Sequence, residues 1–288
     1  MTDPRVVAVT GGTGFLGRRV VALLVERGDT VRLLARRPWA TNVPRGEGVT
    51  TVTGRLEDPP SLDALMEGAT HVVHAAASIG SIDPEELHRT NVEGTRNVVE
   101  AAERARIKRF VHVSSVAAEW RPDALYGASK KAAEDVVAAT DVPWVMLRPP
   151  VILGPGCQVE AKVARFARLG LVPTVAGSGT MFPVHVDDVA LACVTATDAR
   201  AVCGNRYQLP GPEPLDLADI QRRTLERLER RALVLPIPPA LLKAASEVLA
   251  KLTGATPMSA DVIDAIAKGV EMDGSAAARD LAFDPRVV

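Results

Sequence analysis

Tyr126 and Lys130 are the residues of this chain whose types and spacing most directly suggest proton chemistry. They lie four positions apart in DALYGASKKAAEDVVAA, a segment with a helical pattern, so their side chains share one helix face. A phenol with a pKa of about 10 is a poor proton donor or acceptor at neutral pH, and a nearby ammonium lowers that pKa by stabilising the phenolate. Because the same spacing occurs by chance in many helices, the pair alone does not establish an active site.

A glycine-rich segment near the N-terminus predicts a site for phosphate groups. Residues 5–24, RVVAVTGGTGFLGRRVVALL, join an apolar strand over 5–10 to a helical pattern through three glycines at three-residue spacing. Gly11 permits a tight turn, Gly14 lets the main chain approach a pyrophosphate, and Gly17 lets the helix pack against the strand. The unpaired N–H groups at the start of that helix would bind the phosphates. The segment therefore predicts the start of a dinucleotide-binding unit.

The end of the second predicted strand distinguishes the two nicotinamide dinucleotides. An acidic residue there accepts hydrogen bonds from the ribose 2′-hydroxyl of NAD, whereas arginine pairs with the 2′-phosphate of NADP. In VRLLARRP, Ala35 stands where the acid is expected, and Arg36 and Arg37 follow it. A solvated turn is the competing interpretation of the two arginines. Because the acid is absent at the same place, we expect NADP(H) rather than NAD(H) as the cofactor.

The segment TGGTGFLG and four later segments resemble the extended branch of the short-chain dehydrogenase/reductase superfamily, which contains NAD(P)-dependent epimerases, dehydratases and reductases. The later segments occur in the order expected for that branch. They are VVHAAA (72–77), NVEGTRNVVEAA (91–102), YGASK (126–130), and LRPPVILGPG followed by FPVHVDDVA between 147 and 190. The resemblance implies a Rossmann-type α/β fold and a bound nicotinamide cofactor.

The resemblance also implies roles for the catalytic residues. Tyr126 would transfer the proton, while Lys130 would hold the ribose and, with the positive nicotinamide, lower the pKa of the tyrosine. In HVSSVAAEW, Ser115 matches the serine that hydrogen-bonds the substrate oxygen, and Ser114 matches a structural serine. Asn91 matches a helix asparagine that supports a water relay to the lysine. An N-cap role is the competing interpretation of Asn91.

Further cofactor contacts follow from the same resemblance. Ala75 to Ala77 match small residues, where a larger side chain would collide with the cofactor. Arg55 stands where the family has an aspartate that touches adenine, so this contact falls to Asp58 or to main chain. Pro149 and Ile152 lie in the segment that lines the nicotinamide pocket in relatives. The expected cofactor contacts are Gly11, Thr13, Gly14, Phe15, Leu16, Gly17, Arg36, Arg37, Asp58, Ala75, Ala76, Ala77, Tyr126, Lys130, Pro149 and Ile152.

Few residues separate Ser115 from Tyr126 in the sequence, whereas sugar-nucleotide epimerases carry a longer insertion there. In this respect the chain resembles the branch of complex I accessory-subunit-like proteins and small NADP-dependent reductases. The leading hypothesis is NADP-dependent oxidoreduction of a carbonyl or alcohol, with hydride transfer and Tyr126 as proton donor or acceptor. A nucleotide-sugar epimerase or dehydratase is one alternative, for which Lys162, Arg165 and Arg168 could hold a diphosphate. A non-catalytic NADP(H)-binding structural or redox-sensing protein is the other.

Composition and charge agree with an enzyme acting on a small-molecule substrate. The chain has 288 residues, of which 47% are hydrophobic and 24% charged, and its net charge is −1. This overall balance does not indicate nucleic acid or an anionic membrane as a partner. Three cysteines without metal-ligand spacing, no leader segment and no long apolar run predict a reduced cytoplasmic protein without a metal site or membrane span. Proteins of the family that the chain resembles commonly form dimers through two helices that flank the sheet, so a homodimer is expected.

Alternating strand and helix patterns position these residues. Strands are predicted over 5–10, 30–35, 49–53, 71–76, 109–114 and 143–148. Amphipathic helices between most of them predict a doubly wound parallel sheet in a dinucleotide-binding domain over residues 1–150. Residues 151–288 are predicted to form a smaller, mostly helical substrate lobe with segments returning to the sheet. Its helices are predicted over 160–169, 187–197, 216–230 and 239–267, the last broken near Gly254.

Overall fold

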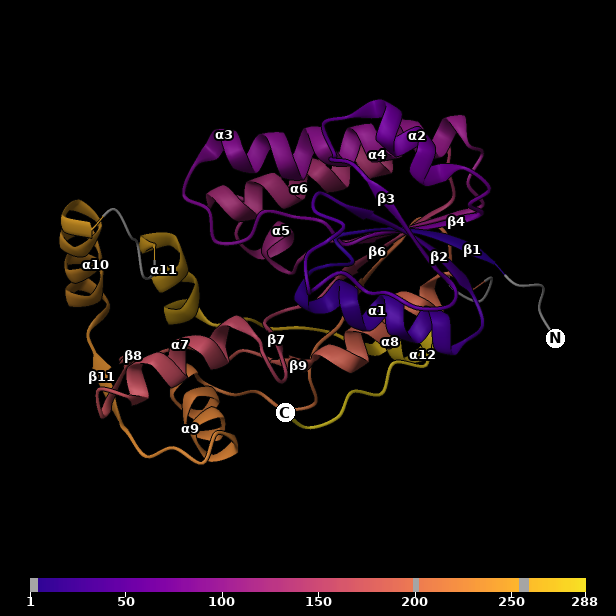
Figure 1. The fold of residues 1–288 in the computed structure, drawn as a ribbon. Helices are drawn as coiled ribbons and strands as arrows, with labels where there is room; N and C mark the ends of the chain where they lie inside the picture. The colour runs from indigo at the N-terminus through magenta and orange to yellow at the C-terminus, as the bar shows by residue number, and fades with distance from the viewer. Residues whose placement is uncertain (1–4, 199–201, 254–258) are drawn as a thin grey trace. The chain divides into compact units, whose positions relative to one another are not determined.

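The computed structural model of the chain describes residues 5–198, 202–253 and 259–288 (Figure 1). These residues divide into two compact units, each built from three stretches of the chain. The first unit takes Met1–Pro149, Val186–Leu209 and Asp273–Pro285. The second unit takes Pro150–His185, Pro210–Met272 and Arg286–Val288. The chain therefore returns twice to the first unit after residue 150.

A seven-stranded parallel sheet forms the centre of the first unit. The strands are β1 (Val6–Thr10), β2 (Thr30–Ala35), β3 (Val49–Thr53), β4 (His71–His74), β5 (Arg109–Val113), β6 (Trp144–Arg148) and β10 (Asn205–Gln208). Their order is β10-β6-β5-β4-β1-β2-β3, so the winding direction reverses between β1 and β4. This arrangement confirms the predicted Rossmann-type fold, in which ligands bind beyond the carboxyl ends of the strands at the reversal. β10 was not predicted from the sequence.

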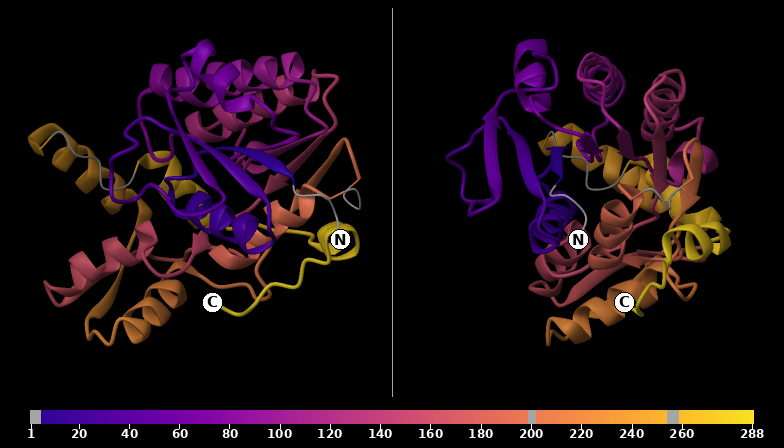
Figure 2. Two further views of the ribbon diagram at one scale, coloured as in Figure 1. Left: turned by 45° about the vertical axis from the view of Figure 1, so that its right-hand side comes forward. Right: turned by 90° about the vertical axis from the view of Figure 1, so that its right-hand side faces the viewer.

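Helices cover both faces of this sheet (Figures 1 and 2). One layer holds α2 (Pro59–Met66), α4 (Gly94–Arg104) and α6 (Leu125–Ala138), and the other holds α1 (Phe15–Glu26), α8 (Val186–Ala196) and α12 (Ser275–Leu281). Leu62 of α2, Val98 of α4 and Val137 of α6 pack against Phe110 and Met146 of the sheet, and all five are completely buried. This apolar layer holds α6 against the sheet, so it positions the tyrosine and lysine that α6 carries.

Short helical segments join the sheet to the longer helices. After β4, α3 (Pro84–Leu87) continues into a single stretch of π-helix, η1 (His88–Glu93), and then into α4. After β5, α5 (Ala117–Trp120) precedes α6. A π-helical turn inserts an extra residue per turn and is often found at functional sites. Its position in this chain coincides with the predicted site residue Asn91.

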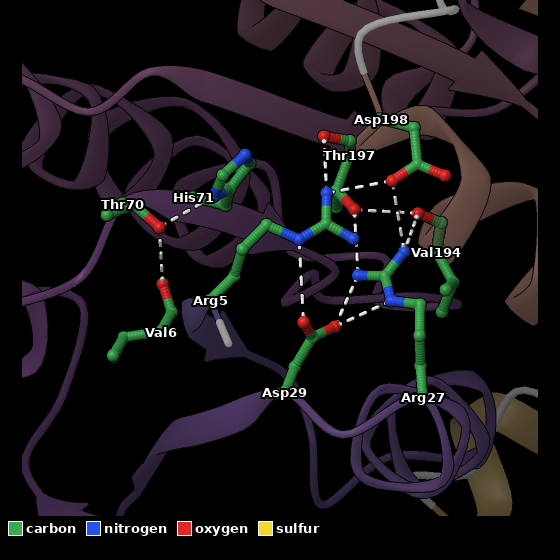
Figure 3. Close-up of polar contacts among 9 residues, drawn as sticks. All are labelled: Arg5, Val6, Arg27, Asp29, Thr70, His71, Val194, Thr197 and Asp198. Carbon is green, nitrogen blue, oxygen red and sulfur yellow. Dashed lines mark hydrogen bonds and ion pairs between the residues drawn. The ribbon is translucent and has the colours of Figure 1, made fainter. Parts of the chain in front are cut away.

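A cluster of charged residues joins the amino ends of β1 and β2 to the end of α8 (Figure 3). Asp29, whose side chain is 5% exposed, forms ion pairs with both Arg5 and Arg27. Arg5 also reaches Asp198 at 2.8 Å, and Arg27 donates to the Thr197 hydroxyl at 3.0 Å. The opposite charges and hydrogen bonds compensate the desolvation of Asp29, and they hold residues that return to the first unit against its earliest strands.

The second unit is mostly helical, with α7 (Gln158–Ala167), α9 (Leu217–Arg227), α10 (Pro239–Thr253) and α11 (Ala260–Lys268). It also contains strands that the sequence did not predict, namely β7 (Ile152–Leu153) paired with β9 (Val184–His185) and β8 (Leu171–Val175) paired with β11 (Leu233–Ile237). These strands are short, and proline interrupts the strand pattern of both β8 and β11. The break predicted near Gly254 lies outside the described residues. No described helix has the length and apolarity needed to cross a membrane.

Candidate active site

The turn after β1 requires glycine at its first position. Gly11 has a φ of +72°, a conformation that side chains rarely adopt, and an added Cβ would lie 2.5 Å from the backbone nitrogen of Ala76. The turn therefore packs directly against the backbone that follows β4, where the sequence predicted small residues. Ala75 and Ala76 lie at this contact, and Ala77 follows them.

The start of α1 forms an anion-binding end of a helix. A Cβ on Gly17 would lie 2.2 Å from the carbonyl oxygen of Gly11, so the helix begins in direct contact with the turn. Gly14 is the N-cap residue, no side chain caps the helix, and its first turn contains no acidic residue. Phe15 and Leu16 therefore present backbone N–H groups at the positive end of the helix dipole, an arrangement that binds phosphate.

A cavity of about 800 Å³ lies beside this turn, and arginines dominate its charge. Arg36 and Arg37 follow Ala35, the buried last residue of β2, and both line the cavity. The lining residues are Thr13, Arg36, Arg37, Ala40, Asn42, Val43, Arg55, Glu57, Glu86, Arg89 and Thr90. Asp58 is absent from this lining and stands at the N-cap of α2, so its contact with adenine stays a prediction.

The acidic residues of this cavity do not balance its arginines. Four guanidiniums, from Arg36, Arg37, Arg55 and Arg89, line the space together with two carboxylates. One of the two, Glu86, accepts hydrogen bonds from two serine hydroxyls at 2.7 and 2.8 Å, and these bonds hold its pKa below the ordinary value. The cavity therefore has an excess of positive charge that suits a phosphate group.

Tyr126 and Ser115 meet at the carboxyl end of β5. Ser115 follows that strand and accepts a hydrogen bond from the Ala117 amide at 3.2 Å, which holds its hydroxyl in place. Tyr126 lies in the first turn of α6 and hydrogen-bonds the Ser115 hydroxyl. Burial raises the pKa of Tyr126 to about 12, although this hydrogen bond lowers it in part. Desolvation of the phenolate therefore outweighs the hydrogen bond, and the lower pKa expected of Tyr126 beside a positive nicotinamide stays a prediction.

Lys130 lies one helical turn after Tyr126 and is almost completely buried, with 1% of its surface exposed. Its ammonium donates a hydrogen bond to the Val113 carbonyl oxygen at 2.9 Å. Burial lowers the pKa of Lys130 to about 8, against the opposing field of the Glu134 carboxylate. A buried ammonium with donors to spare can hold the hydroxyl groups of a ligand, and it remains mostly charged at neutral pH.

Glu134 completes this helix face, and it was not predicted from the sequence. It lies four residues after Lys130, is fully buried, and accepts a hydrogen bond from the Ser114 hydroxyl at 2.6 Å. The Arg148 guanidinium binds both of its carboxylate oxygens, at 2.8 and 2.7 Å. Burial alone would raise the pKa of Glu134, but these hydrogen bonds outweigh burial and lower it. The hydrogen bond between Ser114 and Glu134 ties the end of β5 to α6 and thereby positions Ser115. The four-residue spacing of Glu134 from Lys130 was the available signal in the sequence.

Asn91 connects three segments around the site. It is buried inside η1, so the N-cap interpretation is wrong. Its side chain accepts a hydrogen bond from the Ser78 amide at 2.7 Å and donates to the Ser78 carbonyl at 3.1 Å and to the Ser129 hydroxyl at 3.0 Å. These contacts fix the segment after β4 against α6. The predicted relay through water to Lys130 stays a prediction.

Two buried histidines lie in the sheet below this site. His74 lies within hydrogen-bond distance of the Thr10 hydroxyl at 2.6 Å and of the Thr95 hydroxyl at 2.9 Å. It stacks on His112, with 5.4 Å between ring centroids. Burial, with help from the Lys130 charge, lowers the pKa of His74 to about 3 and that of His112 well below its ordinary value. Both rings are therefore neutral, and His74 joins the first strand to α4, the helix that follows η1.

Pro149 and Ile152 lie on either side of the point in the sequence where the first unit gives way to the second. The Pro149 carbonyl accepts a hydrogen bond from the Val116 amide at 3.1 Å, which fixes it beside the segment that holds Ser115. Ile152 belongs to the second unit, and its contact with a nicotinamide ring stays a prediction. Among the residues that the structure describes, no group of three or more potential metal ligands is gathered.

Comparison with known proteins gives these features a context. Residues 7–209 match the model of the NAD dependent epimerase/dehydratase family. A ceramide reductase of Caulobacter vibrioides is 40% identical over 195 residues, which are 67% of this chain and 61% of that protein. A 2-alkyl-3-oxoalkanoate reductase of Stenotrophomonas maltophilia is 32% identical over 247 residues, which are 76% of this chain and 74% of that protein. The chain thus spans less than two thirds of the ceramide reductase.

The fold is also found in solved structures. The crystal structure of gox2253 superposes with a TM-score of 0.79 at 26% identity, covering 99% of this chain and 94% of that chain. The likeness extends over both units of the chain. The finer assignment to the branch of complex I accessory-subunit-like proteins stays a prediction.

Proposed function

The chain belongs to the NAD dependent epimerase/dehydratase family, and from this premise we propose that it is an oxidoreductase that reduces a carbonyl group with NADPH. The observation that carries the proposal is the meeting of Ser115, Tyr126 and buried Lys130 at the carboxyl end of β5. When bound, a nicotinamide cofactor supplies the hydride. The residues of the chain bind the cofactor, orient the carbonyl oxygen and provide the proton.

The phosphate turn supports a dinucleotide as the cofactor. A Cβ on Gly11 or Gly17 would lie 2.5 or 2.2 Å from backbone atoms, so only glycine allows the tight turn that binds a pyrophosphate in dinucleotide-binding folds. Arg36 and Arg37 line the adjacent cavity, and the acid expected of an NAD site is replaced by Ala35. These residues fit the 2′-phosphate of NADP.

The state of Tyr126 supports a role as proton donor. With a pKa raised to about 12 by burial, its phenol carries a proton at neutral pH and can donate it to the oxygen of a carbonyl group whose carbon receives the hydride. The Ser115 hydroxyl, already in contact with the phenol, would hydrogen-bond the same oxygen. Lys130 would hold the ribose, as the family resemblance implies, and its positive charge would stabilise the phenolate left after proton transfer.

The named relatives support a substrate class. One is a reductase of ceramide, a lipid, and the other reduces a ketone that carries alkyl chains. We infer that the substrate of this chain is likewise a ketone or aldehyde with an apolar chain. A cytoplasmic location is part of the proposal, because Cys157 and Cys193 are buried free thiols, as is usual in a reducing compartment. A homodimer is the expected oligomeric state, which light scattering tests.

Titration with both cofactors tests the NADPH preference. We expect tighter binding of NADPH than NADH to the wild-type protein, and a loss of NADPH affinity of about tenfold or more in Arg36→Ala, because a charge-assisted contact to phosphate is removed. Arg104→Ala is the matched control, since Arg104 lies outside the cavity and pairs with Asp63 on the surface. Equal affinities for the two cofactors in the wild type would refute the preference.

Substitution of the tyrosine tests the enzymatic role. Tyr126→Phe is expected to keep its affinity for NADPH and to lower turnover of alkyl ketones by about 100-fold or more, because a general acid is lost. NADPH absorbance follows the reaction on a panel of ketones and aldehydes. Turnover that survives in Tyr126→Phe removes this residue from the mechanism. A wild-type protein that binds NADPH but turns over neither the carbonyl compounds nor nucleotide sugars supports the non-catalytic alternative instead.

A further inference from the structure

The paired strands β8 and β11 form a small sheet whose two faces differ. On one face, Val172 of β8 is buried against Val163 of α7 and Leu225 of α9. Val234 of β11 packs on the same cluster. This face is therefore the apolar core of the second unit, and side chains at alternate positions of both strands must point the other way.

The opposite face presents leucines to solvent. Leu233 of β11 is 64% exposed and Leu235 is 37% exposed. Leu171 of β8 is 36% exposed and pairs with Leu233 in the strand register, so the two side chains lie side by side. Leu169, in the turn before β8, is 76% exposed. Isolated exposed leucines are ordinary, but three on one face of a small sheet, with a fourth in the adjoining turn, form a patch that is typical of an interaction surface.

Arginines surround the same end of this sheet. Arg230 and Arg231 precede the first residue of β11 by three and two residues, and Arg168 precedes that of β8 by three. Because the strands run parallel and Leu233 pairs with Leu171, these arginines gather at the amino end of both strands. All three are exposed, and their side chains have no ion pair or hydrogen bond among the described residues.

Few acidic residues oppose these arginines. The sequence has no aspartate or glutamate between Glu160 and Asp187, a stretch that includes Lys162 and Arg165 as well as Arg168. Glu229 is the one acidic residue between Arg227 and Leu233. The net charge of −1 is an average over the whole chain, and it does not describe this end of the second unit.

We propose that the leucine patch, Leu169, Leu171, Leu233 and Leu235 with Arg168, Arg230 and Arg231 at its edge, binds the surface of an anionic phospholipid membrane. Leucines at such a surface enter the boundary between headgroups and acyl chains, and arginines pair with lipid phosphates. A second copy of this chain fits the patch poorly, because a two-fold contact through it would bring like-charged arginines together. The proposal rests on the proposed function in one respect: a substrate with an apolar chain would be met at such a surface.

Vesicle binding by the full-length protein tests the patch. We expect co-sedimentation with vesicles of mixed phosphatidylglycerol and phosphatidylcholine, weak binding to phosphatidylcholine alone, and a decline of binding as salt is raised. Leu233→Glu is expected to weaken binding at least about tenfold, and the double variant Arg230→Gln/Arg231→Gln about 30-fold, from the attraction lost per basic residue. Leu191→Glu is the matched control, since Leu191 is 53% exposed on α8 of the first unit.

The outcomes separate this proposal from the proposed function. Equal binding to both kinds of vesicle, or equal losses in Leu233→Glu and Leu191→Glu, overturns the membrane surface. Turnover of a water-soluble ketone, measured without vesicles, is expected to be unchanged in Leu233→Glu, so failure of vesicle binding with normal turnover contradicts the patch alone. Light scattering gives the remaining result: a dimer that Leu233→Glu dissociates, without vesicle binding by the wild type, assigns the patch to self-association and overturns the proposal.

Discussion

Lowering the pH from 7 to 5 is expected to destabilise the first unit, because its buried histidines are neutral in the folded protein. Burial, aided by the charges of Arg5 and Arg27, lowers the pKa of His71 from 6.5 to about 4 (Figure 3). Burial likewise lowers the pKa of His74 to about 3. The unfolded chain binds protons at these residues below about pH 6.5, whereas the folded chain binds them only as the pH approaches the lowered pKa values. The stability that the neutral histidines contribute is therefore fully present above about pH 6.5 and is lost as the pH falls below it.

The size of the effect follows from the two pKa values of each group. For His71, with a pKa of 6.5 in the unfolded and about 4 in the folded state, the free energy of unfolding is lower at pH 5 by about 2 kcal/mol. His74 lowers the free energy of unfolding by about the same amount at pH 5, since its folded pKa is lower still. His112 adds a loss of the same sign. The sum is a large part of the roughly 5–15 kcal/mol that stabilises an ordinary domain.

Urea unfolding at a series of pH values measures this loss. The tryptophans, Trp39, Trp120 and Trp144, all lie in the first unit, so their fluorescence reports on that unit. His71→Gln is expected to lose about 2 kcal/mol less than the wild type between pH 7 and pH 5, because one proton-linked group is removed. His88→Gln, at a histidine whose side chain is 65% exposed, is the control and should follow the wild type. A free energy of unfolding that stays constant from pH 7 to pH 5, or identical curves for all three proteins, would refute the reasoning.

Three further substitutions test other parts of the structure. Gly14→Val is expected to abolish NADPH binding in a fluorescence titration while the protein stays folded by circular dichroism. Valine tolerates the φ of −81°, but its Cβ would lie 3.1 Å from the Gly11 carbonyl oxygen, and its side chain would take up space that a pyrophosphate needs beside the turn. NADPH binding by the folded variant would contradict this. Asp29→Ala is expected to lower the free energy of unfolding by about 3 kcal/mol, since Arg5 and Arg27 both lose a buried partner. A change near zero in urea unfolding would show that these ion pairs do not stabilise the fold. His112→Leu is expected to stabilise the protein by about 1–2 kcal/mol in the same assay, because neither ring nitrogen has a hydrogen-bond partner among the described residues. A loss of stability would show that the ring nitrogens do form hydrogen bonds in solution.

The sequence was sufficient for the features that depend on neighbouring residues. Glycine spacing predicted the turn after β1 because a positive φ at Gly11 and the close approach of Gly17 are local requirements of that turn. Strand and helix periodicity predicted the layered sheet for a similar reason, since each element must bury one face. β10, β8 and β11 were missed, because these short strands are stabilised by partners distant in the chain and proline interrupts the pattern of the last two.

The sequence by itself determined which residue types could act, and only the tertiary structure decided their environment. The four-residue spacing placed Tyr126 and Lys130 on one helix face, but burial in the folded chain raises the pKa of the phenol to about 12. The pairing of Glu134 with Arg148, and the apposition of leucines and arginines at β8 and β11, likewise came from contacts between distant segments. Desolvation and long-range pairing depend on everything packed around a group, and that information exists only once the chain has folded.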